Sequence, residues 1–117
     1  MTAADLFIDT NILIYAHDLD GGAKNQRART LVERLWRERS VPTLSIQVLQ
    51  EMLVNLVRKG VPTETSARIV SSYLAWRVVE NSKLVFERAL LVQARWQVSF
   101  WDASIIAAAQ LAGAKVL

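Results

Sequence analysis

The stretch Leu6-Phe7-Ile8-Asp9-Thr10-Asn11 places an aspartate directly after three large apolar residues. A continuous apolar run is typical of a parallel strand that is buried on both faces. We therefore predict a short strand over residues 5–9, followed by one or two helical turns over residues 11–17. Asp9 is then either the N-cap of this short helix or a functional carboxylate, and Thr10 or Asn11 could cap the helix equally well.

Outward from this stretch, predicted helices and strands alternate along the chain. Apolar residues recur at helical spacing, and Ser45, Ser82 and Ser99 stand where three of the helices begin. The predicted helices cover residues 23–39, 46–59, 62–75, 83–96 and 100–112, and the further strands cover residues 41–44, 77–80 and 114–117. Such alternation predicts an α/β fold with a central parallel sheet flanked by helices. Functional groups are expected beyond the carboxyl ends of its strands.

The composition is that of one folded domain over residues 1–117, of which 52% are hydrophobic. A mean hydropathy of +0.20 is enough for a core and leaves apolar surface for a protein partner. We expect a cytoplasmic protein without a membrane anchor, because no apolar run could span a bilayer and no signal peptide is recognisable. The absence of cysteine excludes thiol catalysis and Cys-ligated zinc. His17, the single histidine, is predicted to lie on the surface without a partner.

The net charge is +3 at pH 7, and arginines are concentrated in the predicted helix over residues 23–39. This stretch has two interpretations. Its arginines could bind phosphates, and Arg27, Arg29 and Arg34 are then the candidates. Alternatively, Glu33 and Glu38 pair with the arginines on an ordinary solvated helix face.

Glu51 belongs to a narrow polar stripe on an otherwise apolar helix. Residues four apart share one helix face, so Gln47, Glu51 and Asn55 line up, with Arg58 following. A helix that faces solvent usually carries a wider and more charged polar face. The stripe therefore indicates either a cleft or the exposed edge of a mostly buried helix.

Asp102 lies three residues after Ser99, which is the spacing of a capping box. It would also be stabilised by the positive end of the helix dipole. The helix that follows is apolar on all sides, which predicts a central position and places Asp102 near the carboxyl edge of the sheet. If the fold brings Asp9, Glu51 and Asp102 together, their mutual repulsion favours a divalent cation as their partner.

Three segments together resemble the PIN domain family, and within it the VapC-type toxins of prokaryotic toxin–antitoxin pairs. They are Phe7-Ile8-Asp9-Thr10-Asn11-Ile12-Leu13-Ile14-Tyr15-Ala16, Leu44-Ser45-Ile46-Gln47-Val48-Leu49-Gln50-Glu51 and Ser99-Phe100-Trp101-Asp102-Ala103. Each segment alone is modest, but their order and spacing make the resemblance specific, and it covers essentially the whole chain.

The resemblance implies a PIN-like three-layer fold and a ribonuclease that depends on Mg²⁺ or Mn²⁺. Asp9, Glu51 and Asp102 would be its catalytic, metal-binding carboxylates, and Thr10 or Asn11 a supporting polar neighbour. The arginines named above would be the candidates for RNA contacts. The resemblance further implies a homodimer and a cognate antitoxin protein that blocks the site.

One departure from the family pattern concerns the end of the chain. PIN domains usually continue with a further acidic residue and a last edge strand, and in this sequence both positions fall beyond Leu117. Two functional readings therefore stay open: an active endoribonuclease, and a catalytically impaired remnant that binds an antitoxin or a second copy. An aspartyl phosphatase is disfavoured, because Asn11 stands where such enzymes carry a second aspartate.

Overall fold

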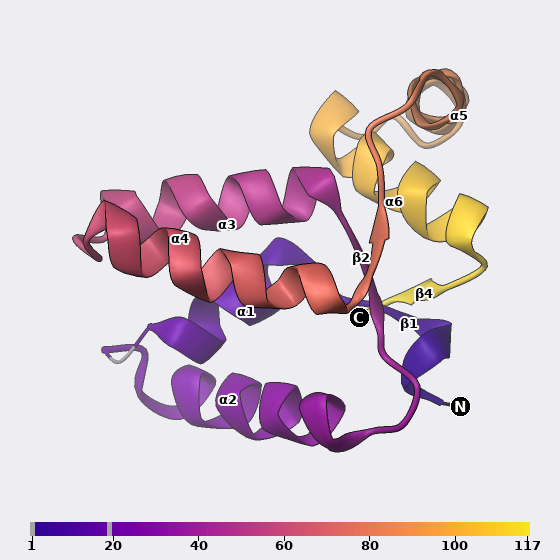
Figure 1. Cartoon of the computed structure of the whole chain (residues 1–117). Coiled ribbons are helices and arrows are strands. Elements are labelled where there is room, and N and C mark those ends of the chain that lie inside the picture. The colour runs from indigo at the N-terminus through magenta and orange to yellow at the C-terminus, as the bar shows by residue number, and fades with distance from the viewer. Residues whose placement is uncertain (1, 19) are drawn as a thin grey trace.

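The computed structural model describes residues 2–18 and 20–117, which form an α/β fold with a short central sheet (Figure 1). The helices are α1 (Thr10–His17), α2 (Gly22–Arg37), α3 (Ile46–Arg58), α4 (Thr63–Ser72), α5 (Lys83–Trp96) and α6 (Phe100–Ala112), with 3₁₀ turns at Ala3–Asp5 and Tyr73–Ala75. The strands are β1 (Leu6–Phe7), β2 (Thr43–Ser45), β3 (Arg77–Val79) and β4 (Lys115–Val116). This confirms the predicted fold class.

The sheet is parallel throughout the described residues, in the order β3-β2-β1-β4. Phe7 of β1 pairs with Thr43 of β2 on one side and with Val116 of β4 on the other. Beyond the ladder, the Ile8 amide donates to the Thr43 carbonyl at 2.8 Å. The last residue of β1 is therefore held beside the first residue of β2, and Asp9 and α3 both follow within a few residues of this pair.

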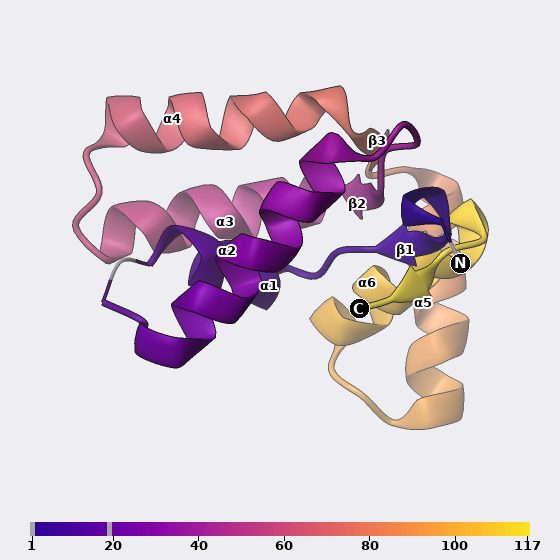
Figure 2. The same ribbon diagram turned by 90° about the horizontal axis from the view of Figure 1, so that it is seen from below.

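The helices lie on two sides of these strands. Figures 1 and 2 show α1 to α4 gathered on one side and α5 with α6 on the other. The main core lies among α1 to α4, the sheet and α6, and its fully buried side chains include Phe7, Leu44 and Met52. A smaller core joins α5 to α6 through Ala89, Val92, Ala103 and Ala107. This layering covers both faces of a parallel sheet, as such sheets require.

Serine caps begin three helices at the predicted positions. Ser45, Ser82 and Ser99 accept hydrogen bonds from the backbone amides of Val48, Val85 and Asp102, at 3.3, 3.1 and 3.1 Å. Each bond satisfies one amide of a helical first turn, which has no partner within its helix. α6 ends at Gly113, whose φ of 68° lies in the left-handed region that glycine adopts without a steric cost.

Several element boundaries differ from the sequence prediction, and two of the differences change the type of structure. Asp5, predicted as the first strand residue, belongs instead to the 3₁₀ turn Ala3–Asp5, because its carboxylate accepts a hydrogen bond from the Thr2 amide at 2.8 Å and closes the turn. The helix predicted over residues 62–75 ends as α4 at Ser72 and continues as a 3₁₀ turn, with Tyr73 and Trp76 buried in the core. Within the described residues, no helix is long and apolar enough to cross a membrane.

Candidate active site

Asp9 lies between β1 and α1, half-buried, and caps the helix that follows it. Its Oδ1 accepts a hydrogen bond from the Thr10 amide at 2.6 Å. The pKa of the Asp9 carboxyl is raised above its usual range, chiefly because burial disfavours the charged form. The negative charges of Glu51 and Asp102 raise this pKa further, while the Thr10 amide lowers it. Asp9 is therefore the N-cap of α1, as one of the two interpretations held, and its role as a functional carboxylate stays a prediction.

Glu51 is bound on both of its carboxylate oxygens. Oε2 accepts a hydrogen bond from the Thr10 hydroxyl at 2.8 Å, and Oε1 accepts one from the Gln47 side-chain amide at 2.8 Å. Thr10 is itself buried, at 4% exposure, so this contact ties the start of α1 to the middle of α3. Hydrogen bonds to a carboxylate are stronger than those between neutral groups, and two of them fix the orientation of Glu51.

Asp102 reaches the same region from the first turn of α6. Its side chain is exposed, and its backbone amide is capped by Ser99. Gln47 of α3 donates a second hydrogen bond, to the Trp101 carbonyl at 3.2 Å, and so connects Glu51 to the residue beside Asp102. Of the two hydrogen bonds of the capping box predicted for Ser99, the one from the Asp102 amide to the Ser99 hydroxyl is formed.

The end of β1, the body of α3 and the start of α6 thus place the three predicted carboxylates so that the charges of Glu51 and Asp102 act on the pKa of Asp9. Among residues 2–18 and 20–117, however, no three acidic or histidine side chains stand close enough together to hold one metal ion directly. A hydrated Mg²⁺ needs only one or two carboxylates and keeps several waters. The donor set, carboxylate oxygens with a threonine hydroxyl beside them, fits such an ion.

The polar stripe of α3 faces a groove. Gln47, Glu51, Asn55 and Arg58 line an open cavity of about 700 Å³ together with Trp101. The Asn55 side-chain amide donates to the Glu51 carbonyl at 2.7 Å. The stripe is thus the wall of a cleft, as one of the two interpretations of the sequence held. Arg58 is the basic residue in this cleft; the sequence placed it in the polar stripe but not among the candidates for RNA contacts.

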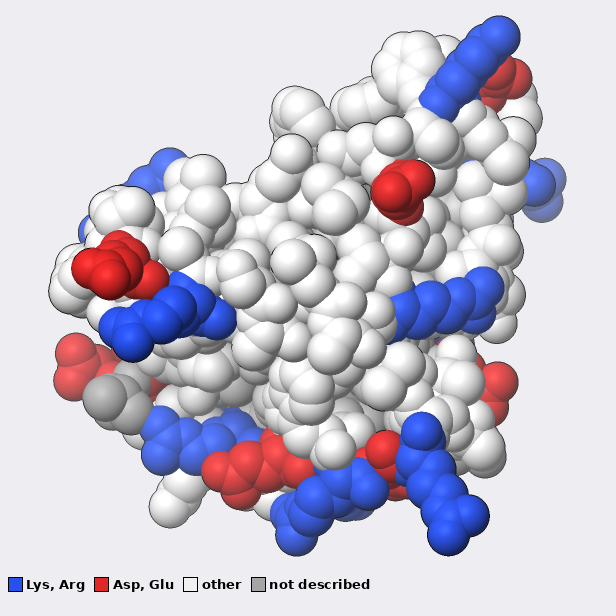
Figure 3. All heavy atoms as spheres, viewed as in Figure 1, with Lys and Arg blue, Asp and Glu red and all other residues white. Residues whose placement is uncertain are grey.

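The arginines predicted to contact RNA do not share one surface. Arg27 and Arg34 line a shallow cavity on α2, whereas Arg29 lines a different cavity with His17 and Glu33. Charged side chains of both signs alternate over α2 along the lower edge of Figure 3. None of these three arginines lines the groove beside Glu51, and the alternation fits the solvated-face interpretation.

The prediction for His17 is wrong. His17 is half-buried, and its Nε2 lies 2.7 Å from the Tyr73 hydroxyl. Burial raises the pKa of Tyr73 to about 12, so the hydroxyl stays protonated and can pair with the imidazole, with the histidine tautomer setting which group donates. Burial and, to a smaller extent, the charge of Arg29 lower the pKa of His17. His17 is a structural link between α1 and the turn after α4.

Thr10 and Gln47 are the site residues that the structure adds in defined roles. The sequence signalled Gln47, because it stands four residues before Glu51 on the same helix face. It gave Thr10 only as a polar neighbour of Asp9, since its partner lies 41 residues away. Asn11, the other predicted neighbour, is exposed on the first turn of α1.

Comparison with known protein families identifies the family of the chain. The sequence matches the PIN domain family over residues 6–117, and the chain belongs to that family. No curated protein matches the sequence.

Solved structures share the fold at low sequence identity. VapC20 of Mycobacterium tuberculosis, described as a sarcin-ricin loop cleaving toxin, aligns with a TM-score of 0.76 at 22% identity, over 93% of this chain and 84% of its own. A toxin–antitoxin complex from Klebsiella pneumoniae aligns with a TM-score of 0.71 at 22% identity, over 95% and 82%. VapBC2 from Rickettsia felis, bound to a promoter DNA fragment, aligns with a TM-score of 0.66 at 16% identity, over 95% and 84%.

Proposed function

We propose that the protein is a VapC-like endoribonuclease that hydrolyses RNA phosphodiester bonds with Mg²⁺ or Mn²⁺ bound by Asp9, Glu51 and Asp102. The observation that carries this proposal is the half-buried Asp9, whose carboxyl pKa is raised by burial and by the charges of the other two acids. A buried carboxylate with two acidic neighbours is unfavourable without a cation. Membership of the PIN family supports the same conclusion.

The chain's own residues would divide the work at this site. Asp9 and Glu51 would hold the cation from the more buried side, and the exposed Asp102 would complete the site from α6. Thr10 and Gln47 position the Glu51 carboxylate through their hydrogen bonds. A bound Mg²⁺ or Mn²⁺ supplies an activated water and stabilises negative charge on the phosphoryl oxygens.

The RNA would approach along the α3 groove. Arg58 lines this groove with Glu51 and Trp101, so it can neutralise a phosphate next to the site. Gln47 and Asn55 offer amides along the same wall. Arg27, Arg29 and Arg34 remain candidates for more distant phosphate contacts, since each is exposed on α2.

A cognate antitoxin and a second copy of the chain are the proposed protein partners. Support comes from large apolar side chains that are more than half exposed, which are Val54, Leu74, Leu84, Phe86, Leu91, Trp96 and Trp101. Most of them lie on α5 and at the start of α6. Two of the similar structures are described as a toxin–antitoxin complex and as VapBC2. We propose a cytoplasmic location.

RNA cleavage and metal-dependent stabilisation test the proposal together. The wild-type protein is expected to cut RNA with Mn²⁺ or Mg²⁺ but not with EDTA, and Mn²⁺ is expected to raise its Tm. Asp9→Asn is expected to lose both effects, and the matched control Asp20→Asn, at an exposed aspartate, is expected to keep them. Metal-dependent cleavage that survives Asp9→Asn would sink the assignment.

One observation favours a second candidate, a catalytically impaired domain that acts by binding. No three acids in the described residues are close enough to coordinate one ion directly, and both Glu51 oxygens already accept hydrogen bonds. This candidate predicts capture of a small antitoxin-like protein, no RNA cleavage and no Tm shift with Mn²⁺. Those results, obtained on the same wild-type preparation, would replace the nuclease proposal.

A further inference from the structure

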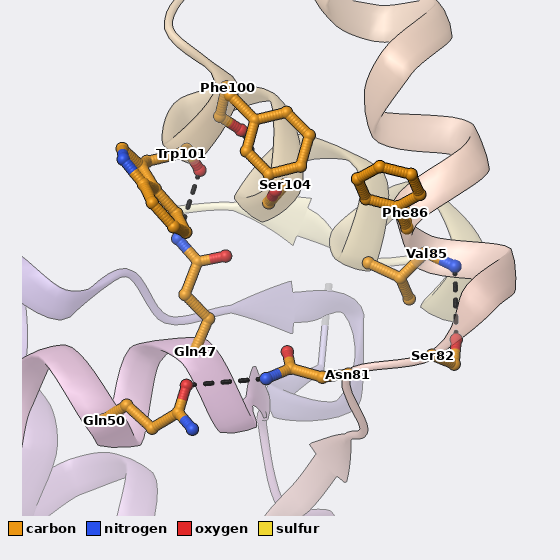
Figure 4. A pocket seen from close by; sticks show the side chains of 9 residues that line it. All are labelled: Gln47, Gln50, Asn81, Ser82, Val85, Phe86, Phe100, Trp101 and Ser104. Atoms are coloured by element: carbon orange, nitrogen blue, oxygen red, sulfur yellow. Dashed lines mark hydrogen bonds between the residues drawn. The ribbon is translucent and has the colours of Figure 1, made fainter.

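A second cavity opens beside the acidic site, between the start of α3, the loop before α5 and the start of α6. Gln47 and Gln50 line it from α3, Asn81 and Phe86 from the α5 side, and Phe100 and Trp101 from α6 (Figure 4). Its volume is about 170 Å³. An apolar cavity of about 150 Å³ can hold a benzene ring, so this cavity has the size of one aromatic ring system.

Aromatic side chains form one wall of this cavity. The rings of Phe86 and Phe100 lie 5.6 Å apart between centroids, and those of Phe100 and Trp101 also lie 5.6 Å apart in a T-shaped arrangement. Trp101 is 66% exposed and Phe86 is 52% exposed. More than half of each side chain is therefore accessible, and a planar aromatic ligand can stack on an accessible ring.

Amide side chains form the opposite wall. Gln47 uses its amide nitrogen toward Glu51 and the Trp101 carbonyl, and within the described residues its amide oxygen accepts no hydrogen bond. The Asn81 amide donates a long hydrogen bond of 3.4 Å to the Gln50 oxygen, and the Asn81 oxygen and the Gln50 nitrogen stay available. Figure 4 shows all three amides beside the space that the aromatic rings enclose. Such a wall offers both donors and acceptors to the edge of a planar ring.

The cavity is continuous with the α3 groove. Gln47, Gln50 and Trp101 line both, and Gln47 binds Glu51 directly. A ligand in the cavity would thus lie next to the proposed metal site, with Arg58 farther along the same groove. An apolar helix of a partner protein fits this lining less well, because it would bury the Gln47 oxygen, the Asn81 oxygen and the Gln50 nitrogen without partners.

We propose that this cavity is a subsite for one unstacked nucleobase of a single-stranded RNA segment, which stacks on Trp101 and meets the amides of Gln47, Gln50 and Asn81 with its edge. This proposal rests on the proposed ribonuclease function and names its substrate class as an unpaired segment. Bases that are splayed out of single strands are recognised in this way, by stacking on aromatic side chains and by hydrogen bonds to their edges.

An abasic scan tests the subsite separately from catalysis. The affinity of a fluorescent single-stranded hexaribonucleotide is measured by anisotropy in EDTA, and each base in turn is removed while its backbone is kept. For the wild-type protein, removal of one particular base is expected to weaken binding about tenfold, the size of one base–aromatic stack. Trp101→Ala is expected to abolish this loss, and Trp101→Phe to retain most of it.

Trp96→Ala is the matched control. Trp96 is 59% exposed, similar to Trp101, but lines a different cavity with Arg88 and Leu91. It is expected to keep the wild-type abasic profile. An abasic profile that is the same in the wild-type protein and in Trp101→Ala overturns the subsite.

Cleavage of the intact hexamer with Mn²⁺ is measured in parallel. Cleavage by the wild-type protein with no base-specific loss means that the subsite fails and the ribonuclease stands. Binding with the expected abasic profile but without cleavage means that the subsite stands and the ribonuclease proposal fails. Loss of dimerisation or of a protein partner in Trp101→Ala, with an unchanged abasic profile, would assign the cavity to a protein and overturn the proposal.

Discussion

The Thr10 hydroxyl donates a hydrogen bond of 2.8 Å to Oε2 of Glu51, across 41 residues of sequence. Thr10 is the first residue of α1, and Glu51 lies in the middle of α3. The Thr10 amide also donates a hydrogen bond to the Asp9 carboxylate. One threonine thereby contacts two of the three acidic residues of the candidate site.

Thr10→Val is expected to lower the free energy of unfolding by about 2 kcal/mol, because it leaves a partly buried carboxylate oxygen without its donor. Urea unfolding in EDTA measures this loss. Thr10→Ser keeps the hydroxyl and is expected to lie closer to the wild-type value. Equal losses for valine and serine would mean that packing, rather than the hydrogen bond, stabilises this contact.

Thr43→Val is expected to act in the opposite direction. Thr43 of β2 is fully buried, and its hydroxyl has no hydrogen-bond partner among the described residues. A buried hydroxyl without a partner is unfavourable, and valine has the same shape and suits a strand. An increase of about 1 kcal/mol in the free energy of unfolding is expected. A decrease in Tm would show that the Thr43 hydroxyl does find a partner in solution.

Asp9→Asn is expected to alter the pH dependence of stability. Because the pKa of Asp9 is raised above 3.8 in the folded state, the folded protein binds a proton more tightly than the unfolded chain does. Its contribution to stability is complete below pH 3.8 and is lost as the pH rises through the folded pKa. Asparagine still caps α1, so Asp9→Asn is expected to remove this loss.

Asp9→Ala is the control for the cap at this position. Alanine removes the acceptor of the Thr10 amide and is expected to cost about 1 kcal/mol. Metal-free unfolding of the wild-type protein and both variants at pH 4 and pH 7 gives the comparison. If the wild-type protein gained stability relative to Asp9→Asn as the pH was raised from 4 to 7, the raised pKa of Asp9 would be contradicted.

His17→Gln is expected to flatten the stability profile near neutral pH. The pKa of His17 is lowered from 6.5 in the folded state, so the unfolded chain takes up a proton first as the pH falls. Stability is therefore full above pH 6.5 and is lost as the pH drops through the folded pKa. Because the chain has a single histidine, thermal unfolding at pH 7.5 and 5.5 isolates its effect. A wild-type Tm that rises toward pH 5.5 relative to His17→Gln would contradict this assignment.

Arg58→Gln is expected to weaken binding of single-stranded RNA several-fold and to reduce the salt dependence by the equivalent of one phosphate contact. Arg58 lies in the groove with Glu51, whereas Arg27 lies on α2 in a separate cavity. Arg27→Gln is the matched control, with the same change of charge and an expected smaller effect. Anisotropy titrations over a range of salt concentrations separate the two. A larger loss for Arg27→Gln would move the RNA path to α2.

Features that depend on neighbouring residues were predictable from the sequence. The caps at Ser45, Ser82 and Ser99 form within four residues, so residue type and spacing are sufficient to locate them. The order of strands and helices followed from apolar periodicity in the same way. Asp9, Glu51 and Asp102 emerged because carboxylates are unexpected beside long apolar runs, although their binding of metal stays a prediction.

Features that depend on distant residues were not predictable. Nothing around His17 indicates Tyr73, which lies 56 residues away, and the histidine was therefore misplaced on the surface. By contrast, the separation of Arg29 from Arg27 and Arg34 follows from helical spacing within α2, because residues seven apart share a helix face and residues two apart do not. Arg58 became a candidate for a phosphate contact only when the structure showed that it lines a groove with Glu51 and Trp101.

The hydrogen bonds that connect Thr10, Glu51, Gln47 and Trp101 also bear on how the molecule folds. The bond from Thr10 to Glu51 spans 41 residues and the bond from Gln47 to Trp101 spans 54, so neither can form within a short nascent segment. Contacts of such long range are late and slow to form in folding. A ribosome-bound chain that has emerged only as far as α4 lacks Asp102, so the candidate site is complete only after most of the polypeptide has been synthesised.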